Sequence, residues 1–224
     1  MALILSIETS AKAGSVAVHQ HQELLATMEL HIGQSHAAQL APMINQVLRI
    51  AGVDVAALDA VAVSAGPGSY TGLRIGVSTA KGLCYANSKP LIAIDTLKLM
   101  VAQIREFAPP GALLCPMIDA RRMEVYCSVF DRNLFEVMTV EAKVIDEHSF
   151  ADQLENYKVW FFGDGVDKCK AVIHHSNAAF INGVYPRAAD MGPLAYDKLV
   201  NNQAEDLVLF EPFYLKQFQA KTSV

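Results

Sequence analysis

A glycine- and hydroxyl-rich segment, SAGPGSYTGLRIG at residues 64–76, has the composition of a loop that could bind a phosphate group. It follows a small apolar segment typical of a buried strand and leads into residues with helical spacing. Free N–H groups at the start of a helix bind anions. The segment nevertheless lacks the lysine of GxxxxGK[ST], and Thr71 stands where GxGxxG needs its third glycine. Spacing alone therefore favours a tight turn in which Ser69 or Thr71 caps the helix.

Small residues recur every four positions in the helix that follows, at Gly72, Gly76 and Ala80. Glycine inside a helix costs about 1 kcal/mol relative to alanine, so this stripe predicts that another backbone approaches closely. That backbone could belong to the protein's own sheet. Alternatively, this helix and the preceding one form an exposed apolar pair that awaits a partner.

The elements that position these segments follow the order β-β-β-α-β-α-β, which fits a ribonuclease-H-like sheet. Strands are predicted at 3–7, 15–19, 24–30, 59–65 and 91–95, and helices at 35–51, 71–86 and 96–107. In the helix at 35–51, Ser35 is the expected N-cap, and Pro42 predicts a kink.

Pro109-Pro110-Gly111 is the best candidate linker, which predicts an N-terminal domain at 1–108 and a smaller C-terminal domain at 109–224. The second half is less regular. Strands are predicted there at 112–118, 125–131 and 159–162, with a helix capped by Ser149 ending near Tyr157 and another reaching Asn201.

Composition bounds the function. The 224 residues are 52% hydrophobic and 18% charged, which indicates a globular protein with enough apolar surface for a large oligomeric contact. A net charge of −5 argues against gripping nucleic acid unaided. No secretory signal or membrane span is expected, and four cysteines without a CxxC pair predict buried reduced thiols in a cytoplasmic protein.

Several motifs together resemble a known family. ILSIETSAKAGSVAV, SAGPGSYTGLRIGVSTAKGL, PLIAIDTL and IDARRMEVY occur in the order and spacing of the TsaB (YeaZ) family, bacterial proteins of tRNA N6-threonylcarbamoyladenosine biosynthesis. The resemblance covers the first 130 residues well, and EPFYLK near the end resembles the family's closing motif. Met123 departs from the pattern, because many members have glycine there.

The resemblance implies an α/β fold of the actin- and hexokinase-like (ASKHA) class, with two similar domains of which the second is degenerate. It also implies a non-catalytic subunit that binds and activates the TsaD enzyme. TsaD transfers threonylcarbamoyl to N6 of the adenosine beside the anticodon of ANN-decoding tRNAs. By the same resemblance, the TsaE ATPase is expected to join the larger complex, the chain alone to form a homodimer, and tRNA to be contacted only indirectly.

The stripes on the two helices, together with this resemblance, predict the surface that binds TsaD or a second copy of the chain. Its expected residues are His36, Gln39, Leu40, Met43, Ile44, Val47, Thr71, Arg74, Ile75, Gly76, Thr79 and Leu83.

An autonomous ATP-dependent kinase of the same superfold stays open as an alternative. Glu8, Thr9 and Ser10 lie where the superfold places its first phosphate loop, and a carboxylate there could hold a magnesium-bound water. The second loop has only Asp164-Gly165 as a poor match. These three residues are therefore weak cofactor candidates: the chain is expected to bind no cofactor on its own, with ATP or ADP only at a composite site with partners.

A glycoprotease-like metallohydrolase is the other alternative. The catalytic relative carries an HxxxH metal pair after a strand resembling LIAID, and Thr96 and Met100 stand at those two positions here. Neither is a metal ligand, and the remaining histidines lack suitable spacing, so no metal site is expected. Ser64 and Ser69 are not in a GxSxG elbow, and no catalytic residue is predicted.

The charged turn DARRME carries a separate prediction. Asp119, Arg121 and Glu124 are expected to hold the domain junction by pairing with one another or capping the turn. The alternative is that Arg121 and Arg122 contact tRNA phosphate.

Overall fold

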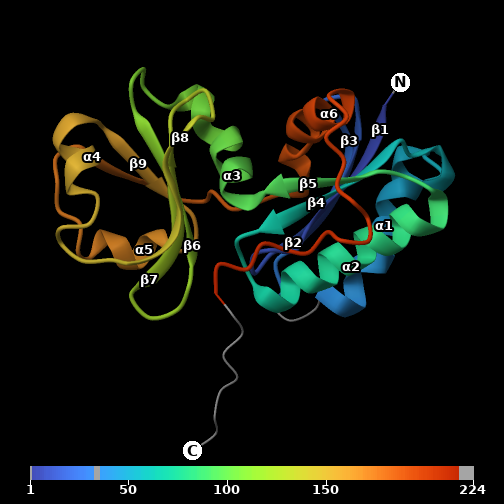
Figure 1. The fold of residues 1–224 in the computed structure, drawn as a ribbon, viewed down its shortest axis with the longest axis horizontal. Helices are drawn as coiled ribbons and strands as arrows, with labels where there is room; N and C mark the ends of the chain where they lie inside the picture. Colours follow the sequence, from blue (N-terminus) through green and yellow to red (C-terminus); the bar gives the residue numbers. More distant parts are fainter. Residues whose placement is uncertain (1, 33–35, 217–224) are drawn as a thin grey trace, which may run out of the picture.

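The computed structural model describes residues 2–32 and 36–216, which form two five-stranded sheets lying side by side (Figure 1). The first sheet has the order β3-β2-β1-β4-β5, with β1 (Leu3–Glu8), β2 (Gly14–Gln20), β3 (Glu23–Leu30), β4 (Ala60–Gly66) and β5 (Leu91–Asp95). The second has the order β10-β9-β6-β7-β8, with β6 (Leu113–Asp119), β7 (Glu124–Phe130), β8 (Glu136–Val144), β9 (Val159–Phe162) and β10 (Ala178–Ile181).

The two sheets repeat one topology. In the first, β1, β2 and β3 form an antiparallel meander, and β4 and β5 add to β1 in parallel. In the second, β6, β7 and β8 form the meander, and β9 and β10 add to β6 in parallel. This confirms the predicted ribonuclease-H-like order and the expectation of two similar units.

The crossover helices show why the second unit is the degenerate one. In the first unit, α1 (His36–Ala51) and α2 (Tyr70–Asn87) are long and cover one face of the sheet (Figure 1). Their counterparts α4 (Ala151–Asn156) and α5 (Val166–Lys170) have only six and five residues. A short 3₁₀ turn, η1 (Val55–Ala57), precedes β4.

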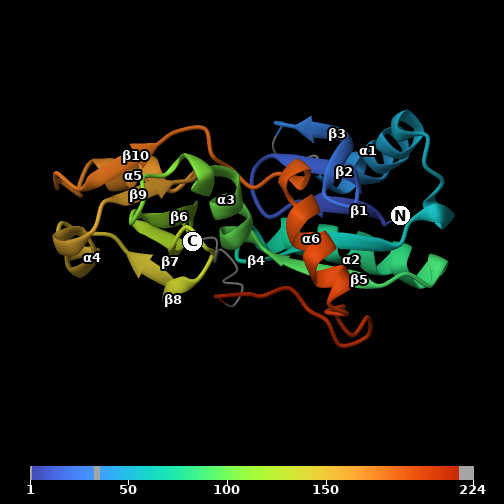
Figure 2. The same ribbon diagram turned by 90° about the horizontal axis from the view of Figure 1, so that it is seen from above.

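The last helix of each unit packs against the other unit's sheet. Helix α3 (Thr96–Ile104), extended by η2 (Arg105–Phe107), leaves β5 and packs against β6 and β7. Helix α6 (Gly192–Val200), preceded by η3 (Ala188–Asp190), packs back against β1 and β5. Figure 2 shows α6 lying over the first sheet and α3 beside the second.

The C-terminal part of the chain differs from the predicted domain division. Met191 and Ala195 join an apolar cluster with Ile4 and Ile92 of the first sheet. Further on, the segment that contains Phe210 packs against the first unit's main core. A continuous C-terminal domain at 109–224 is therefore not what the structure shows, because the chain returns to the first unit after β10.

Some local predictions for the second half also need correction. Strands β8 and β10 and helix α5 are absent from the sequence-based prediction. The predicted capping box at Ser149 is wrong, because the Ser149 hydroxyl donates to Asp146 Oδ1 at 2.8 Å and does not cap the helix. The residue that precedes α4 is Phe150, which has a left-handed backbone with φ 65°. The predicted cap at Ser35 lies outside the described residues.

Candidate functional site

The glycine loop between β4 and α2 holds the chain's own backbone. Ser69 caps α2, because its hydroxyl accepts from Gly72 N at 3.3 Å, which confirms one of the two predicted caps. Ser69 N donates to Ser10 O at 2.6 Å, and Thr9 Oγ1 donates to Gly72 O at 2.7 Å. The start of α2 is therefore bound to the β1–β2 loop.

The small-residue stripe on α2 has the same explanation. A Cβ on Gly72 would overlap Thr9 O, and one on Gly76 would overlap Thr9 Oγ1. A Cβ on Gly68, within the loop itself, would lie 2.5 Å from Ser10 O. The close approach predicted from the stripe is thus made by the protein's own β1–β2 loop. Gly76 is buried by that contact and cannot form part of an exposed partner surface.

Glu8 ends β1 beneath this loop and is fully buried. Its Oε1 accepts from Ser10 N at 2.5 Å, while its Oε2 and the Ser10 hydroxyl have no hydrogen-bond partner among the described residues. Desolvation by burial raises the pKa of Glu8 to about 7, and the hydrogen bond from Ser10 N partly opposes the rise. Because Glu8, Thr9 and Ser10 are all buried, a phosphate would reach them only if the loop moved.

The apolar sides of α1 and α2 pack on their own sheet. Leu40, Met43, Ile44 and Val47 are at most 6% exposed and lie in the main apolar cluster of the first unit. As components of an exposed docking stripe these four predicted residues are corrected, because the apolar side of an amphipathic helix fills the nearest core. Gln39, Thr71 and Arg74 are exposed, and Ile75, Thr79 and Leu83 are half-buried. The side chain of His36 lies outside the description.

The outward face of these two helices carries mostly small residues. The exposed residues of the two helices are Ala37, Ala38, Gln39, Ala41, Pro42, Asn45 and Arg49 on α1, and Thr71, Arg74, Ser78, Gly82 and Ala86 on α2. Two large apolar side chains, Ile50 at 64% and Tyr85 at 82% exposure, lie toward the ends of α1 and α2. We call this set of residues the outer helix face. Helices α1 and α2 lie side by side and contact each other (Figure 1).

A C-terminal strap at residues 203–216 runs back over the first unit and closes the glycine loop. Phe213 N donates to Ala65 O at 2.7 Å. Earlier in the strap, Lys81 of α2 donates to Val208 O at 3.2 Å and to Phe210 O at 3.0 Å. Sequence analysis missed this contact. The EPFYLK motif marked the strap without showing what it touches.

The end of the strap carries an aromatic and charged cluster. The Tyr214 ring lies 4.6 Å from the Tyr70 ring, and the Arg74 guanidinium lies 4.5 Å over Tyr70. Lys216 then reaches the second unit, where its ammonium group pairs with Glu124 of β7. The strap therefore links the two units at the glycine-loop side of the molecule.

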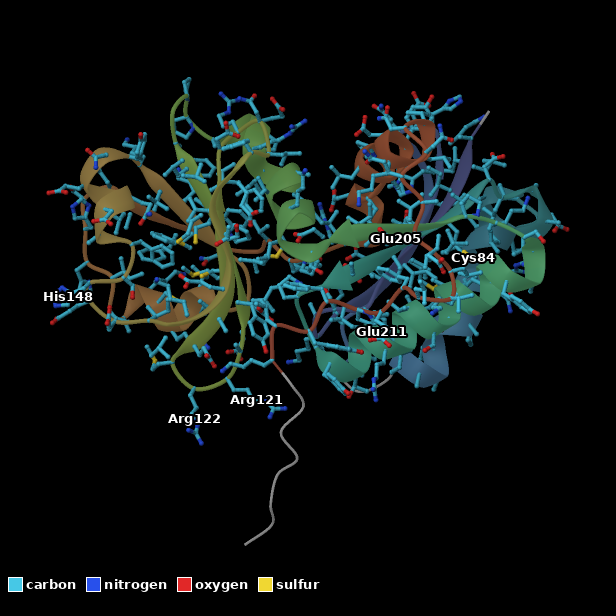
Figure 3. All side chains as sticks on the ribbon, in the orientation of Figure 1. Cys84, Arg121, Arg122, His148, Glu205 and Glu211 are labelled. Atoms are coloured by element: carbon cyan, nitrogen blue, oxygen red, sulfur yellow. The ribbon has the colours of Figure 1, made fainter. Side chains whose placement is uncertain are left out.

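Among the described residues, the carboxylates of the turn between β6 and β7 form ion pairs, whereas its two arginines do not. Asp119 accepts from Arg121 N at 3.0 Å, which matches the predicted cap of the turn. The ion pairs differ from the prediction, because Asp119 pairs with Lys168 and Glu124 pairs with Lys216 of the strap. Arg121 and Arg122 are exposed and extend into solvent in Figure 3. No ion pair of either arginine occurs among the described residues, so the structure does not support the predicted junction role of the Arg121 side chain.

The positions that correspond to a metal pair in the catalytic relative are part of the core. Thr96 and Met100 are both fully buried in α3. Over residues 2–32 and 36–216, no group of three or more His, Cys, Asp or Glu side chains could hold a metal ion. In the same part of the chain, none of the helices combines the length and apolar character needed to cross a membrane.

The chain is similar to known proteins in both sequence and fold. A family model described as "TsaD: tRNA N6-adenosine threonylcarbamoyltransferase" matches residues 30–224. The Escherichia coli (strain K12) protein named "tRNA threonylcarbamoyladenosine biosynthesis protein TsaB" is 30% identical over 220 residues, 95% of this chain and 94% of that protein. The solved structure "YeaZ from Pseudomonas aeruginosa" is 25% identical, with a TM-score of 0.83 over 96% of this chain and 100% of its own.

A more distant likeness concerns the fold alone. Component A of (R)-2-hydroxyglutaryl-CoA dehydratase from Acidaminococcus fermentans has a TM-score of 0.54 at 9% identity, over 89% of this chain and 100% of its own. The duplicated sheet with exchanged helices defines a two-unit protein of the actin- and hexokinase-like (ASKHA) class, with a degenerate second unit. Within that class, the chain belongs to the TsaB (YeaZ) family, inside the broader family that the matching model describes.

Proposed function

We propose that the chain takes part in forming N6-threonylcarbamoyladenosine in tRNA, as a non-catalytic subunit that binds and activates a TsaD-family transferase. The observation that carries this proposal is that the candidate nucleotide-binding residues and the positions of the metal pair are all buried. Glu8, Thr9 and Ser10 are buried under the glycine loop, and core residues occupy the metal-pair positions Thr96 and Met100. Likeness over nearly the full length to a protein named for this pathway supports the assignment.

The outer helix face is the surface that we assign to the transferase. Its small side chains allow another helix to approach closely, and Ile50 and Tyr85 offer apolar anchors at its edge. The contact residues retained from the sequence-based set are the exposed Gln39, Thr71 and Arg74 and the half-buried Ile75, Thr79 and Leu83. The same face pairs two copies of this chain when no transferase is present, so the two contacts compete.

The remaining members of the assembly follow from this role. The TsaE ATPase joins the complex of this chain with the transferase. The transferase binds most of the tRNA, because this chain has a net charge of −5. Any ATP or ADP binds at a composite site that partners complete. In this proposal the chain acts in the cytoplasm.

Gly82→Arg tests the surface directly. A Cβ at Gly82 meets nothing within 4 Å, so the substitution leaves the fold intact and places a long charged side chain on the outer helix face. We expect this variant to lose co-purification with the TsaD-family enzyme and to become monomeric in sedimentation. Gly76→Leu is unsuitable as a test because it would collide with Thr9.

Val200→Arg is the matched control. Val200 is 53% exposed at the end of α6, which lies on the other side of the first sheet from α1 and α2 (Figure 1). This variant should bind the transferase as the wild type does. Equal retention of the enzyme by the Gly82→Arg and Val200→Arg variants would contradict the assigned surface.

A further inference from the structure

The turn between β6 and β7 presents two consecutive arginines in an unusual backbone conformation. Arg121 has φ 70° and Arg122 has φ 46°, in the left-handed region that side chains other than those of Asn and Asp rarely adopt. The turn is held by main-chain bonds: Ala120 N donates to Glu124 O, and Glu124 N to Arg121 O, each at 3.1 Å. The backbone therefore fixes where the two arginines leave the turn.

The acidic groups around this turn are already engaged. Asp119 pairs with Lys168 and accepts from Arg121 N at 3.0 Å through its carboxylate. Lys168 also donates to Arg122 O at 2.9 Å, and Glu124 pairs with Lys216 of the strap. A third carboxylate, of Asp164, accepts from Asp119 N at 2.9 Å. The carboxylates of Asp119 and Glu124 are therefore paired with lysines and not with the two arginines.

The two guanidinium groups are left facing solvent, as Figure 3 shows. The equivalent loop of the first unit, between β1 and β2, is different. There Thr9 and Ser10 are buried against Gly68 and Gly72, and Lys12 is the one exposed charged residue of the loop. The first loop is closed against the glycine loop and has a single exposed cation. The β6–β7 turn instead presents two adjacent cations, and no carboxylate among the described residues pairs with either guanidinium group.

We propose that Arg121 and Arg122 contact the phosphate backbone of tRNA in the assembled complex. This inference rests on the proposed function. A guanidinium group matches a phosphate in planar, two-bond geometry, and it keeps its charge at every physiological pH. RNA is favoured over an acidic protein surface because the chain's relatives are named for a tRNA modification, whereas the assigned protein contact lies on α1 and α2.

The test measures tRNA binding by the complex of this chain with the TsaD-family enzyme over a range of salt concentrations. Each phosphate contact contributes about 0.7–0.9 to the slope of log K against log salt. Arg121→Gln with Arg122→Gln should flatten that slope by roughly 1.4–1.8 if both arginines meet phosphates. Lys89→Gln with Lys158→Gln removes two charges elsewhere and should leave the slope unchanged.

A second variant keeps the result independent of folding. Arg121→Gly with Arg122→Gly also removes both charges but favours the left-handed backbone, so its melting temperature should not fall. It should flatten the slope as the glutamine variant does. An unchanged slope in intact complexes of both variants would overturn the proposal.

Two further outcomes are distinct. Loss of the transferase from either variant would also overturn the RNA contact and show instead that the turn touches the protein partner. Failure of the wild-type chain to form the complex at all would refute the proposed function, and this inference with it.

Discussion

Glu8→Gln should change how the stability of this protein depends on pH. Burial raises the pKa of Glu8 from 4.5 to about 7, so the folded state holds this proton more tightly than the unfolded chain does. The resulting contribution to stability is complete below pH 4.5 and is lost as pH rises through 7. A shift of this size corresponds to roughly 3 kcal/mol in total, or about 1.4 kcal/mol per pH unit between pH 5 and 6.5.

The assay is denaturant unfolding of wild type and Glu8→Gln between pH 4.5 and 9. Other buried groups also have shifted pKa values: burial lowers the pKa of His19 and raises that of Asp95. Because both are present in each protein, their contributions cancel in the difference between the two curves. The wild type should lose about 3 kcal/mol relative to the variant by pH 8, and most of that loss should precede pH 7.5.

Parallel curves for the two proteins would refute this reasoning. They would mean that Glu8 is solvated or differently hydrogen-bonded in solution, and that the glycine loop does not seal the end of β1 as described.

Gly72→Ala should lower the free energy of unfolding by about 1–3 kcal/mol, because the new Cβ overlaps Thr9 O, whereas Gly82→Ala, which meets nothing, should raise it by about 0.5–1 kcal/mol. Equal effects in thermal melts would contradict the account of the stripe. Lys216→Gln should lower stability by less than about 1 kcal/mol, and the loss should vanish at 1 M salt, because its pair with Glu124 is partly exposed. A larger, salt-independent loss would show that the strap does more than pair charges.

The first unit could be predicted well from sequence for a physical reason. Its central strands consist of small apolar residues that are buried on both faces. Ser69 marks the start of α2, and Gly52 marks the end of α1. The edge strands of the second unit lack this signal. Strand β8 (EVMTVEAKV) is exposed or half-buried along its whole length, and β10 has four half-buried residues, so neither shows the alternation of a half-buried strand.

The candidate surfaces show a second limit. An apolar stripe at Leu40, Met43 and Val47 has the same spacing whether it faces a partner or the chain's own sheet, and only the packed structure shows that it faces the sheet. The stripe at Gly72 and Gly76 likewise predicted a close backbone but not whose. The strap contact at Ala65 joins residues far apart in sequence, so no local pattern could have revealed it.

The most direct test of the central claim is threonylcarbamoyl transfer to tRNA, measured from threonylcarbamoyl-adenylate with the TsaD-family enzyme of the same organism. The account predicts transfer when enzyme and chain are combined, far less with the enzyme alone, and none with the chain alone. Transfer by this chain without the enzyme, or an enzyme rate that is indifferent to its presence, would contradict it.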